Sequence, residues 1–271
     1  IFGFTLLGLF HGIADAIKMF TKEDIVPERA DKVLHTLAPF FSVFFAMVAF
    51  AAIPFGDRLI IGDRVIDLQV AKIDAALLYV FAMLSLGVYG MILAGFASRN
   101  NYAILGSLRA SAQMISYEIA LGLSIIPVLM VFGKLNLTDI VAHQAAHGWL
   151  LLPLWGDGLS LQNWLLLIPL GISFVVFTTS IFAETNRMPF DLPECETELV
   201  GGYHTEYSSM KFALFFMGEY INMVTMSALV TLLFLGGWNA YGLPLWPIVA
   251  FAIKIFFLIN LIAVSAATAV E

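Results

Sequence analysis

Charged residues are scarce in this chain. They make up 12% of its 271 residues, against roughly 25% in an ordinary soluble domain, while hydrophobic residues make up 61%. This balance excludes a typical soluble protein and favours a membrane protein. Positive charge is the scarcer sign, because 13 Lys and Arg stand against 20 Asp and Glu and leave a net charge of −7. Nucleic-acid binding is excluded, since it needs a basic surface that displaces counterions from phosphates.

Cysteine occurs once, as Cys195. A single cysteine excludes an intrachain disulfide, a Cys-ligated iron–sulfur cluster and a structural zinc site of the Cys type. We therefore expect no metal site here, and any redox centre to sit in another protein or in a bound ligand. The chain begins with Ile1 and lacks a charged leader region, so we expect a piece of a longer chain rather than one that starts with a signal peptide.

Long apolar runs dominate what remains. Six of them have about the 20 residues that a helix needs to cross the hydrocarbon core of a bilayer. No internal repeat or low-complexity linker separates them, so we predict an all-α fold, a polytopic transmembrane helix bundle that forms a single membrane domain over residues 1–271. The predicted spans are Leu34–Pro54, Ala75–Ala97, Ile115–Gly133, Trp164–Ala183, Phe212–Gly236 and Leu245–Val270.

The distribution of Lys and Arg predicts the orientation of the spans. Segments 1–33, 98–114 and 184–211 together hold eight, whereas the alternate segments 55–74, 134–163 and 237–244 hold four. Positively charged loops stay on the cytoplasmic side. The first set is therefore predicted to be cytoplasmic, or on the matrix side in an organelle.

The first segment, Ile1–Phe20, is too interrupted by glycine and polar residues to be a span. Its polar residues His11, Asp15 and Lys18 recur at spacings of four and three, which places them on one face of a helix. The pattern is typical of an interfacial amphipathic helix that lies on the membrane.

The densest polar chemistry lies between the fourth and fifth predicted spans, in the segment Ala183–Tyr207. Pro189 and Pro193 stiffen this segment, and Gly201 and Gly202 permit close approach of its backbone. Acids crowded in this way have coupled ionisations, which suits proton handling, although a solvated acidic loop is the simpler alternative. The segment holds one arginine, Arg187, and six acids: Glu184, Asp191, Glu194, Glu196, Glu198 and Glu206.

Three charged residues lie inside the predicted spans, namely Glu118, Glu219 and Lys254. A charge at mid-membrane costs roughly 2.5–3.5 kcal/mol on insertion scales, so each should face protein or water. Glu118 could pair with Arg109 in the preceding loop, or it could reach the membrane surface as an interfacial carboxylate. For Lys254, pairing with a neighbouring subunit and a role in proton relay stay equally open.

Six segments carry a close resemblance to a known family. They are ADAIKMFTKED at Ala14–Asp24, LAP at Leu37–Pro39, NYAILGSLRASAQMISYE at Asn101–Glu118, AETNRMPFDLPE at Ala183–Glu194, GYHTEYSSMKFALFFMGEY at Gly202–Tyr220 and FLGGW at Phe234–Trp238. Through them the chain resembles the heel-subunit family of respiratory complex I, the proton-pumping NADH:quinone oxidoreductase. The family has eight spans, including one before Ile1, and a GPNRxG segment that is absent here.

The resemblance implies a subunit without a redox centre of its own, which lines a quinone-binding chamber and couples quinone reduction to proton translocation. FMN and the iron–sulfur clusters would then belong to partner subunits of the peripheral arm. Small membrane subunits and antiporter-like subunits would be its neighbours in the bilayer of a bacterial inner membrane or a mitochondrial inner membrane. The implied chamber and proton-coupling residues are Asp15, Arg109, Glu118, Glu184, Arg187, Asp191, Glu194, Glu196, Glu198, Glu206, Tyr207 and Glu219.

Two other functions stay open at this point. Membrane subunits of energy-converting hydrogenases and ferredoxin-dependent complexes are similar in fold, but Thr185, Asn186 and Arg187 favour the NADH-linked type. A stand-alone ion-coupled transporter could use the same acids, although inverted repeats and paired broken helices are absent from the sequence. A transporter should be active alone, whereas a subunit of complex I should be inert without its partners.

Overall fold

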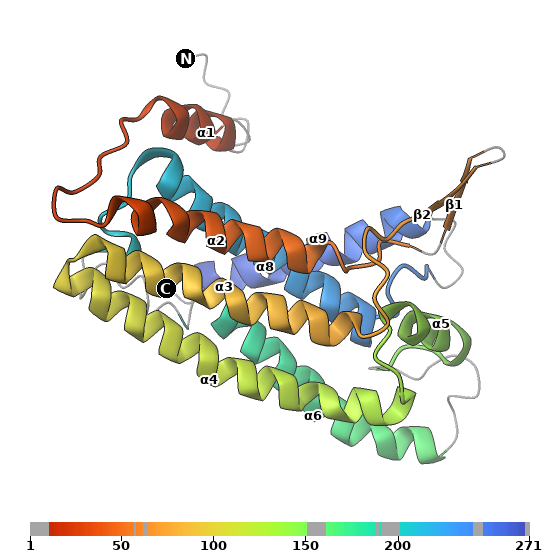
Figure 1. Cartoon of the computed structure of the whole chain (residues 1–271). Coiled ribbons are helices and arrows are strands. Elements are labelled where there is room, and N and C mark those ends of the chain that lie inside the picture. Colours follow the sequence, from red (N-terminus) through yellow and green to blue (C-terminus); the bar gives the residue numbers. More distant parts are fainter. Residues whose placement is uncertain are drawn as a thin grey trace.

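A computed structural model describes residues 11–56, 58–61, 64–150, 161–187, 190, 201–240 and 246–268. Helices dominate this part of the chain, and the long ones run roughly along one direction (Figure 1). They are α2 (Lys32–Phe50), α3 (Ala76–Ser98), α4 (Asn101–Phe132), α6 (Leu161–Glu184), α8 (Ser209–Phe234) and α9 (Pro247–Thr268). The predicted all-α helix bundle is confirmed.

Five of these helices are long and apolar enough to cross a membrane: α2, α3, α4, α8 and residues Leu165–Glu184 of α6. They correspond to the first five predicted spans. The sixth prediction corresponds to α9, whose apolar stretch within the described residues, Pro247–Ile262, is shorter. These lengths support a protein that passes through the membrane several times.

The third span was predicted to begin too late. Residues 98–114 were expected to form a loop, yet α4 begins at Asn101 and only Arg99 and Asn100 separate it from α3. The Asn100 side chain accepts a hydrogen bond from the Tyr102 N–H and so caps the helix, while Arg99 turns the chain in a left-handed conformation with φ of 49°. At 1.5 Å per residue the 32 residues of α4 extend about 48 Å, well beyond the ~30 Å hydrocarbon core.

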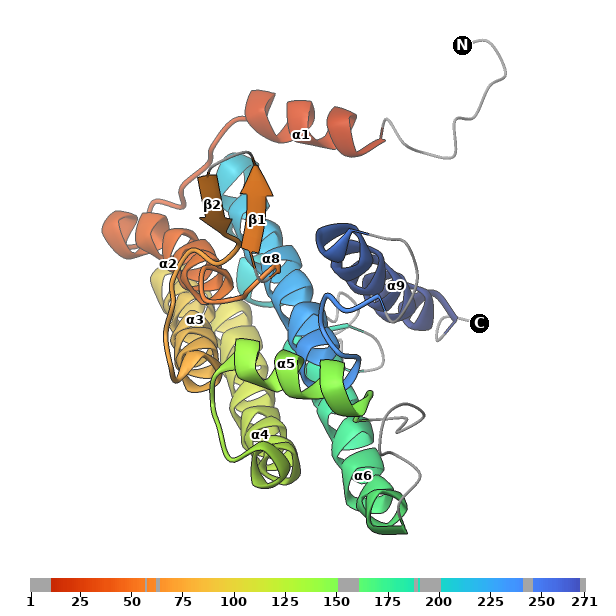
Figure 2. The ribbon, with the colours of Figure 1, turned by 90° about the vertical axis from the view of Figure 1, so that its right-hand side faces the viewer.

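Three smaller elements flank the long helices. Helix α1 (His11–Thr21) lies crosswise to the bundle (Figure 2). Residues 1–10 of the predicted interfacial helix lie outside the described residues, and its position on the membrane stays a prediction. An antiparallel hairpin, β1 (Arg58–Ile61) and β2 (Arg64–Asp67), follows α2 and projects from the bundle (Figure 1). A short helix, α5 (Leu137–His147), follows α4. The hairpin and α5 were not predicted, because both are short and lie between the long apolar runs that identify membrane spans.

The connections meet at two ends of the bundle, as the alternation of spans requires. We call the end formed by residues 22–31, 99–100, 185–187 and 201–208 the acid end, and the end formed by the hairpin, α5 and residues 235–240 the hairpin end. Asp31 N–H donates to Ala97 O across the acid end, and Asn239 Nδ2 donates to Val141 O at the hairpin end. Which end is cytoplasmic stays a prediction.

Lys254 of α9 binds to backbone of its own polypeptide at the hairpin end. Its ammonium donates to the backbone oxygens of Leu235, Gly237 and Asn239 at 2.8, 2.8 and 3.0 Å, and it lies 5.5 Å from the ring centre of Trp149. These oxygens belong to the C-cap of α8 and to the turn that follows it. A cation at the C-terminus of a helix also complements the helix dipole. The contacts support a structural role for Lys254, joining α9 to α8.

Glycines let backbones approach closely inside the bundle. A Cβ added to Gly106 of α4 would lie 2.7 Å from Gly202 Cα and 2.9 Å from Tyr203 N. Both clashes are with backbone, which cannot rotate away as a side chain can. The acid end therefore packs onto α4 only because residue 106 has no side chain.

We expect Gly106→Ala to lower the free energy of unfolding by about 1–3 kcal/mol, since overpacking forces the backbone to move. Gly122→Ala on the same helix is the matched control, because among the described residues no atom beyond the neighbouring backbone of α4 lies within 4 Å of its added Cβ. Thermal unfolding of the purified protein in detergent measures the difference. Equal melting temperatures for the two variants would contradict the packing described here.

Candidate functional site

The candidate site residues that the structure describes lie mainly at the acid end or in the helical turns that adjoin it. Four predicted acids of the segment after α6 lie outside the described residues, and their roles stay predictions: Asp191, Glu194, Glu196 and Glu198.

Glu206 is held by the turn between α3 and α4. Asn100 Nδ2 donates to Glu206 Oε1 at 2.6 Å, across 106 residues of sequence. The same asparagine caps α4 through its side-chain oxygen, so both ends of its amide are used. The position of this carboxylate is thereby tied to the start of α4.

Glu219 is buried on α8 and faces protein rather than lipid, as predicted. Its side chain is 8% exposed, and Tyr203 Oη donates to its Oε1 at 3.0 Å. Tyr203 belongs to a short 3-10 helix, η2 (Gly202–His204), and its ring packs edge-on against Phe215. A buried carboxylate needs such a donor to offset the loss of water.

A second pair of acids lies on α4 and α6. Glu184 at the end of α6 is 5% exposed, and its Oε2 has no hydrogen-bond partner among the described residues. The charge of Glu118 acts on it through space. Glu118 is half-buried and accepts a hydrogen bond from Ser85 Oγ of α3, so its carboxylate is engaged within the bundle.

The predicted pairing of Arg109 with Glu118 is wrong. Both residues belong to α4, where nine positions span about 13.5 Å and two and a half turns, so the two side chains leave opposite sides of the helix. The prediction failed because it placed Arg109 in a loop. The late start assigned to the third span was the source of that error.

Arg187 lies just after α6 and packs over an aromatic ring. Its guanidinium carbon is 5.2 Å from the ring centre of Tyr220 on α8, a geometry that favours a cation over the ring face. Its Nη2 has no hydrogen-bond partner among the described residues. We expect Arg187 to pair with carboxylates of the segment that follows it, which lies outside the described residues.

An apolar cavity of about 760 Å³ lies between α1, α2 and α8. Its walls include Met19 of α1, Met47 and Phe50 of α2, and Phe216 and Met217 of α8. Asp15 of α1 is the single charged residue among those described along it. Tyr220, whose ring lies beneath the Arg187 guanidinium, also lines the cavity. The cavity and the acid end therefore share a wall.

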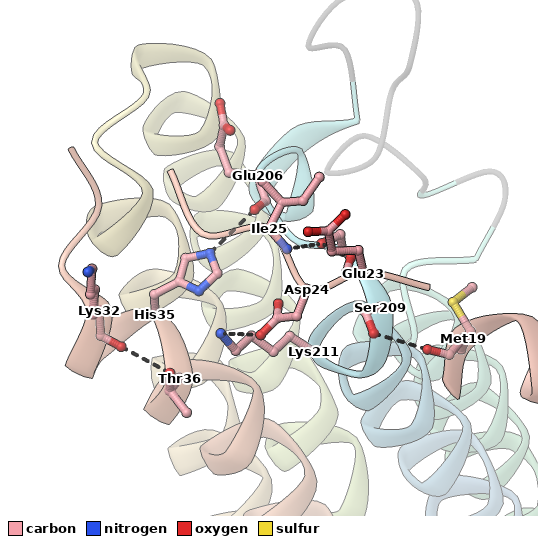
Figure 3. Close-up of polar contacts among 11 residues, drawn as sticks. Met19, Glu23, Asp24, Ile25, Lys32, His35, Thr36, Glu206, Ser209 and Lys211 are labelled. Atoms are coloured by element: carbon pink, nitrogen blue, oxygen red, sulfur yellow. Dashed lines mark hydrogen bonds and ion pairs between the residues drawn. The ribbon is translucent and has the colours of Figure 1, made fainter. Parts of the chain in front are cut away.

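The sequence analysis missed the residues that hold α1 over this cavity. Ser208 Oγ accepts from Ile25 N–H at 3.0 Å, Ser209 Oγ donates to Met19 O at 3.0 Å, and Lys211 Nζ lies 2.9 Å from Asp24 Oδ2. Figure 3 shows the contacts of Ser209 and Lys211. Nothing in the local pattern predicts them, because the partners lie more than 180 residues apart.

Burial shifts the pKa values of two titratable groups in the segment before α8. Burial lowers the pKa of His204 from 6.5 to about 4, because the protonated ring loses its water. Its neighbours are the rings of Tyr203, Phe212 and Phe216. Burial also raises the pKa of the Tyr207 phenol above its ordinary value, so the predicted site residue Tyr207 stays protonated.

No group of three or more His, Cys, Asp or Glu among the described residues could hold a metal ion. The functional assignment depends instead on similarity to known proteins. The family model described as NADH dehydrogenase matches residues 2–270. The chain belongs to this family. The membership confirms the family resemblance carried by the six segments.

Several relatives are named as one particular subunit of NADH-quinone oxidoreductase, the one designated by the letter H. Those from Solibacter usitatus and Wolbachia pipientis are each 47% identical to this chain, over 255 and 264 residues, and cover 91% and 93% of it. The one from Syntrophotalea carbinolica is 47% identical over 249 residues and covers 92%. This family member spans 61%, 73% and 69% of their respective lengths.

We expect His204 to make stability depend on pH. The unfolded chain takes up a proton near pH 6.5 and the folded chain only near pH 4, so the stabilisation is complete above 6.5 and is lost as pH falls towards 4. His204→Phe preserves the ring packing and cannot titrate. Between pH 7 and 5 the melting temperature of the wild type should therefore fall more than that of the variant, and parallel curves would contradict the assignment.

Proposed function

We propose that this chain serves as the heel subunit of an NADH-quinone oxidoreductase, a membrane subunit that lines the quinone-binding chamber and couples quinone reduction to proton translocation. The observation that carries the proposal is the apolar cavity that shares a wall with the acid end. The names of the relatives support the NADH-linked assignment over the hydrogenase and transporter alternatives. Because the chain spans only 61% of the first of them, the activity of the whole enzyme belongs to this proposal.

The cavity suits a long apolar substrate such as a quinone with an isoprenoid tail. Ligand pockets for molecules of that kind enclose roughly 300–1,000 Å³ and are mostly apolar, with few polar groups. The methionine side chains Met19, Met47 and Met217 are flexible and adapt to irregular apolar ligands. Asp15 supplies the one carboxylate among the described residues of this wall, where it can bind a polar group of the substrate or a proton.

The carboxylates at the acid end provide groups that can take up and release protons. Tyr203 links Glu219 to the short segment that also carries Glu206, and Asn100 holds the Glu206 carboxylate at the start of α4. Glu118 and Glu184 form a second pair. Carboxylates that lie close to one another exchange protons in response to nearby charge. A change of charge in the cavity is thus relayed by residues of α8 and α4.

The partners follow from this role. FMN and iron–sulfur clusters are assigned to peripheral-arm subunits, and the protons are moved by antiporter-like subunits in the same bilayer. Five helices with the length and composition of membrane spans support the membrane location. A bacterial inner membrane is the proposed site, since the three relatives come from Solibacter, Wolbachia and Syntrophotalea.

The proposal is tested by gentle purification through a tag on this subunit. Mass spectrometry of the co-eluting proteins and an NADH:quinone reductase assay are made on the same sample. Flavin and iron–sulfur subunits together with inhibitor-sensitive activity support the proposal. Hydrogenase subunits would favour the first alternative, and a lone protein that moves ions in liposomes would favour the transporter.

Filling the cavity should weaken quinone binding. Ala213 of α8 lines it, so we expect Ala213→Trp to raise the KM for quinone roughly tenfold, because the indole occupies the space of the tail. Ile172→Trp is the matched control, since Ile172 is 61% exposed on α6 and away from the cavity. A wild-type KM in the Ala213 variant would contradict the assignment of the cavity.

Neutralising two of the acids should impair turnover without preventing assembly. We expect Glu219→Gln and Glu206→Gln to lower quinone reductase and proton-pumping activity roughly tenfold or more, because the amide binds no proton at neutral pH. Glu28→Gln removes an exposed acid of the same end and is the control. Full retention of both activities in the two variants would contradict a role in coupling.

A further inference from the structure

His35 lies at the acid end, although nothing in its local sequence marks it as functional. It is near the start of α2 and fully buried. Its Nε2 is 3.3 Å from the backbone oxygen of Glu206 (Figure 3), and its ring stacks on Tyr207 with the centroids 4.0 Å and the planes 5° apart. One side chain of the first span thus touches two consecutive residues of the candidate site.

The hydrogen bond places a proton on one nitrogen of the imidazole. A backbone oxygen can only accept, so Nε2 carries the proton in this contact. Nδ1 is buried without a hydrogen-bond partner among the described residues. In this arrangement the ring is neutral and its single N–H is used to hold the backbone of Glu206, which is the behaviour of a group that positions others.

The turn of α2 that carries His35 lacks one backbone hydrogen bond. Pro39 follows His35 by four residues within the helix, and proline has no N–H to donate to the carbonyl of the residue four before it. The His35 carbonyl therefore lacks its helical hydrogen bond, and the helix is loosened at this point.

Glu206 is consequently held from two directions. Asn100 fixes its carboxylate from the start of α4, whereas His35 fixes its backbone from α2. The residues that follow, Ser208 and Lys211, hold the segment leading from α1. Figure 3 shows that the contacts of His35, Ser209 and Lys211 cluster around one short stretch of chain.

We infer that His35 is a positioning residue, which holds the Glu206 backbone and the Tyr207 ring against α2 and so keeps the Glu206 carboxylate aligned with Asn100. Its effect on activity rests on the proposed function, but its contacts can be tested without it. The ring does not line the cavity, so His35 acts on turnover and leaves quinone binding unchanged.

Two substitutions separate the contacts. His35→Phe retains an aromatic ring for the stack and removes the donor, whereas His35→Gln retains an N–H of similar reach and removes the ring. Thr36→Ala, at the neighbouring exposed position, is the control. In the assembled complex, we expect His35→Phe to lower kcat roughly fivefold with unchanged KM for quinone, the factor that corresponds to one hydrogen bond of about 1 kcal/mol, and His35→Gln to recover part of it.

Hydrogen exchange of the same complexes gives a readout that does not depend on activity. Peptides containing residues 204–208 should exchange faster in His35→Phe than in Thr36→Ala, and His35→Gln should lie between them. Wild-type kcat and exchange in His35→Phe would overturn the inference, as would a His35→Gln variant no better than His35→Phe, or a change in KM that matches the change in kcat. If the wild-type complex reduces no quinone, the proposed function fails and exchange alone decides the role of His35.

Discussion

The close approach of Gly106 to Gly202 is the constraint on which the acid end depends. An irregular segment can enter a helix bundle only where a helix offers space for its backbone, and α4 offers that space at Gly106. The turn that begins there directs Tyr203 inwards to Glu219 and leaves Glu206 beside Asn100. Two carboxylates from different elements are thereby brought to the same end of the molecule.

Removing these carboxylates from water is costly, and the structure meets the cost with neutral donors. Tyr203, Asn100 and Ser85 each donate to a different acid. Each donor replaces part of the hydration that its carboxylate loses on burial.

The transmembrane helices could be predicted from the sequence because lipid imposes a minimum length of apolar residues. Glu219 could likewise be picked out, since a carboxylate within an apolar run must face protein. The start of α4 could not, because its first turns are rich in Ala, Ser and Leu and carry Arg109, which resembles a loop when only hydropathy is considered. The contacts of three other residues could not be predicted either, because their partners lie more than 100 residues away in the sequence. These residues are His35, Asn100 and Lys211.

Helix α1 differs from the other walls of the cavity in how it is attached. It lies across the bundle (Figure 2), and hydroxyls of Ser208 and Ser209 together with the partly exposed pair Asp24–Lys211 secure it and the segment that follows. Those bonds are weak and reversible, whereas α2 and α8 are packed into the core. The width of the cavity is therefore governed by a peripheral element. Among the described residues, α1 is the cavity wall that adds no side chain to the buried hydrophobic clusters, so moving it would leave those clusters intact.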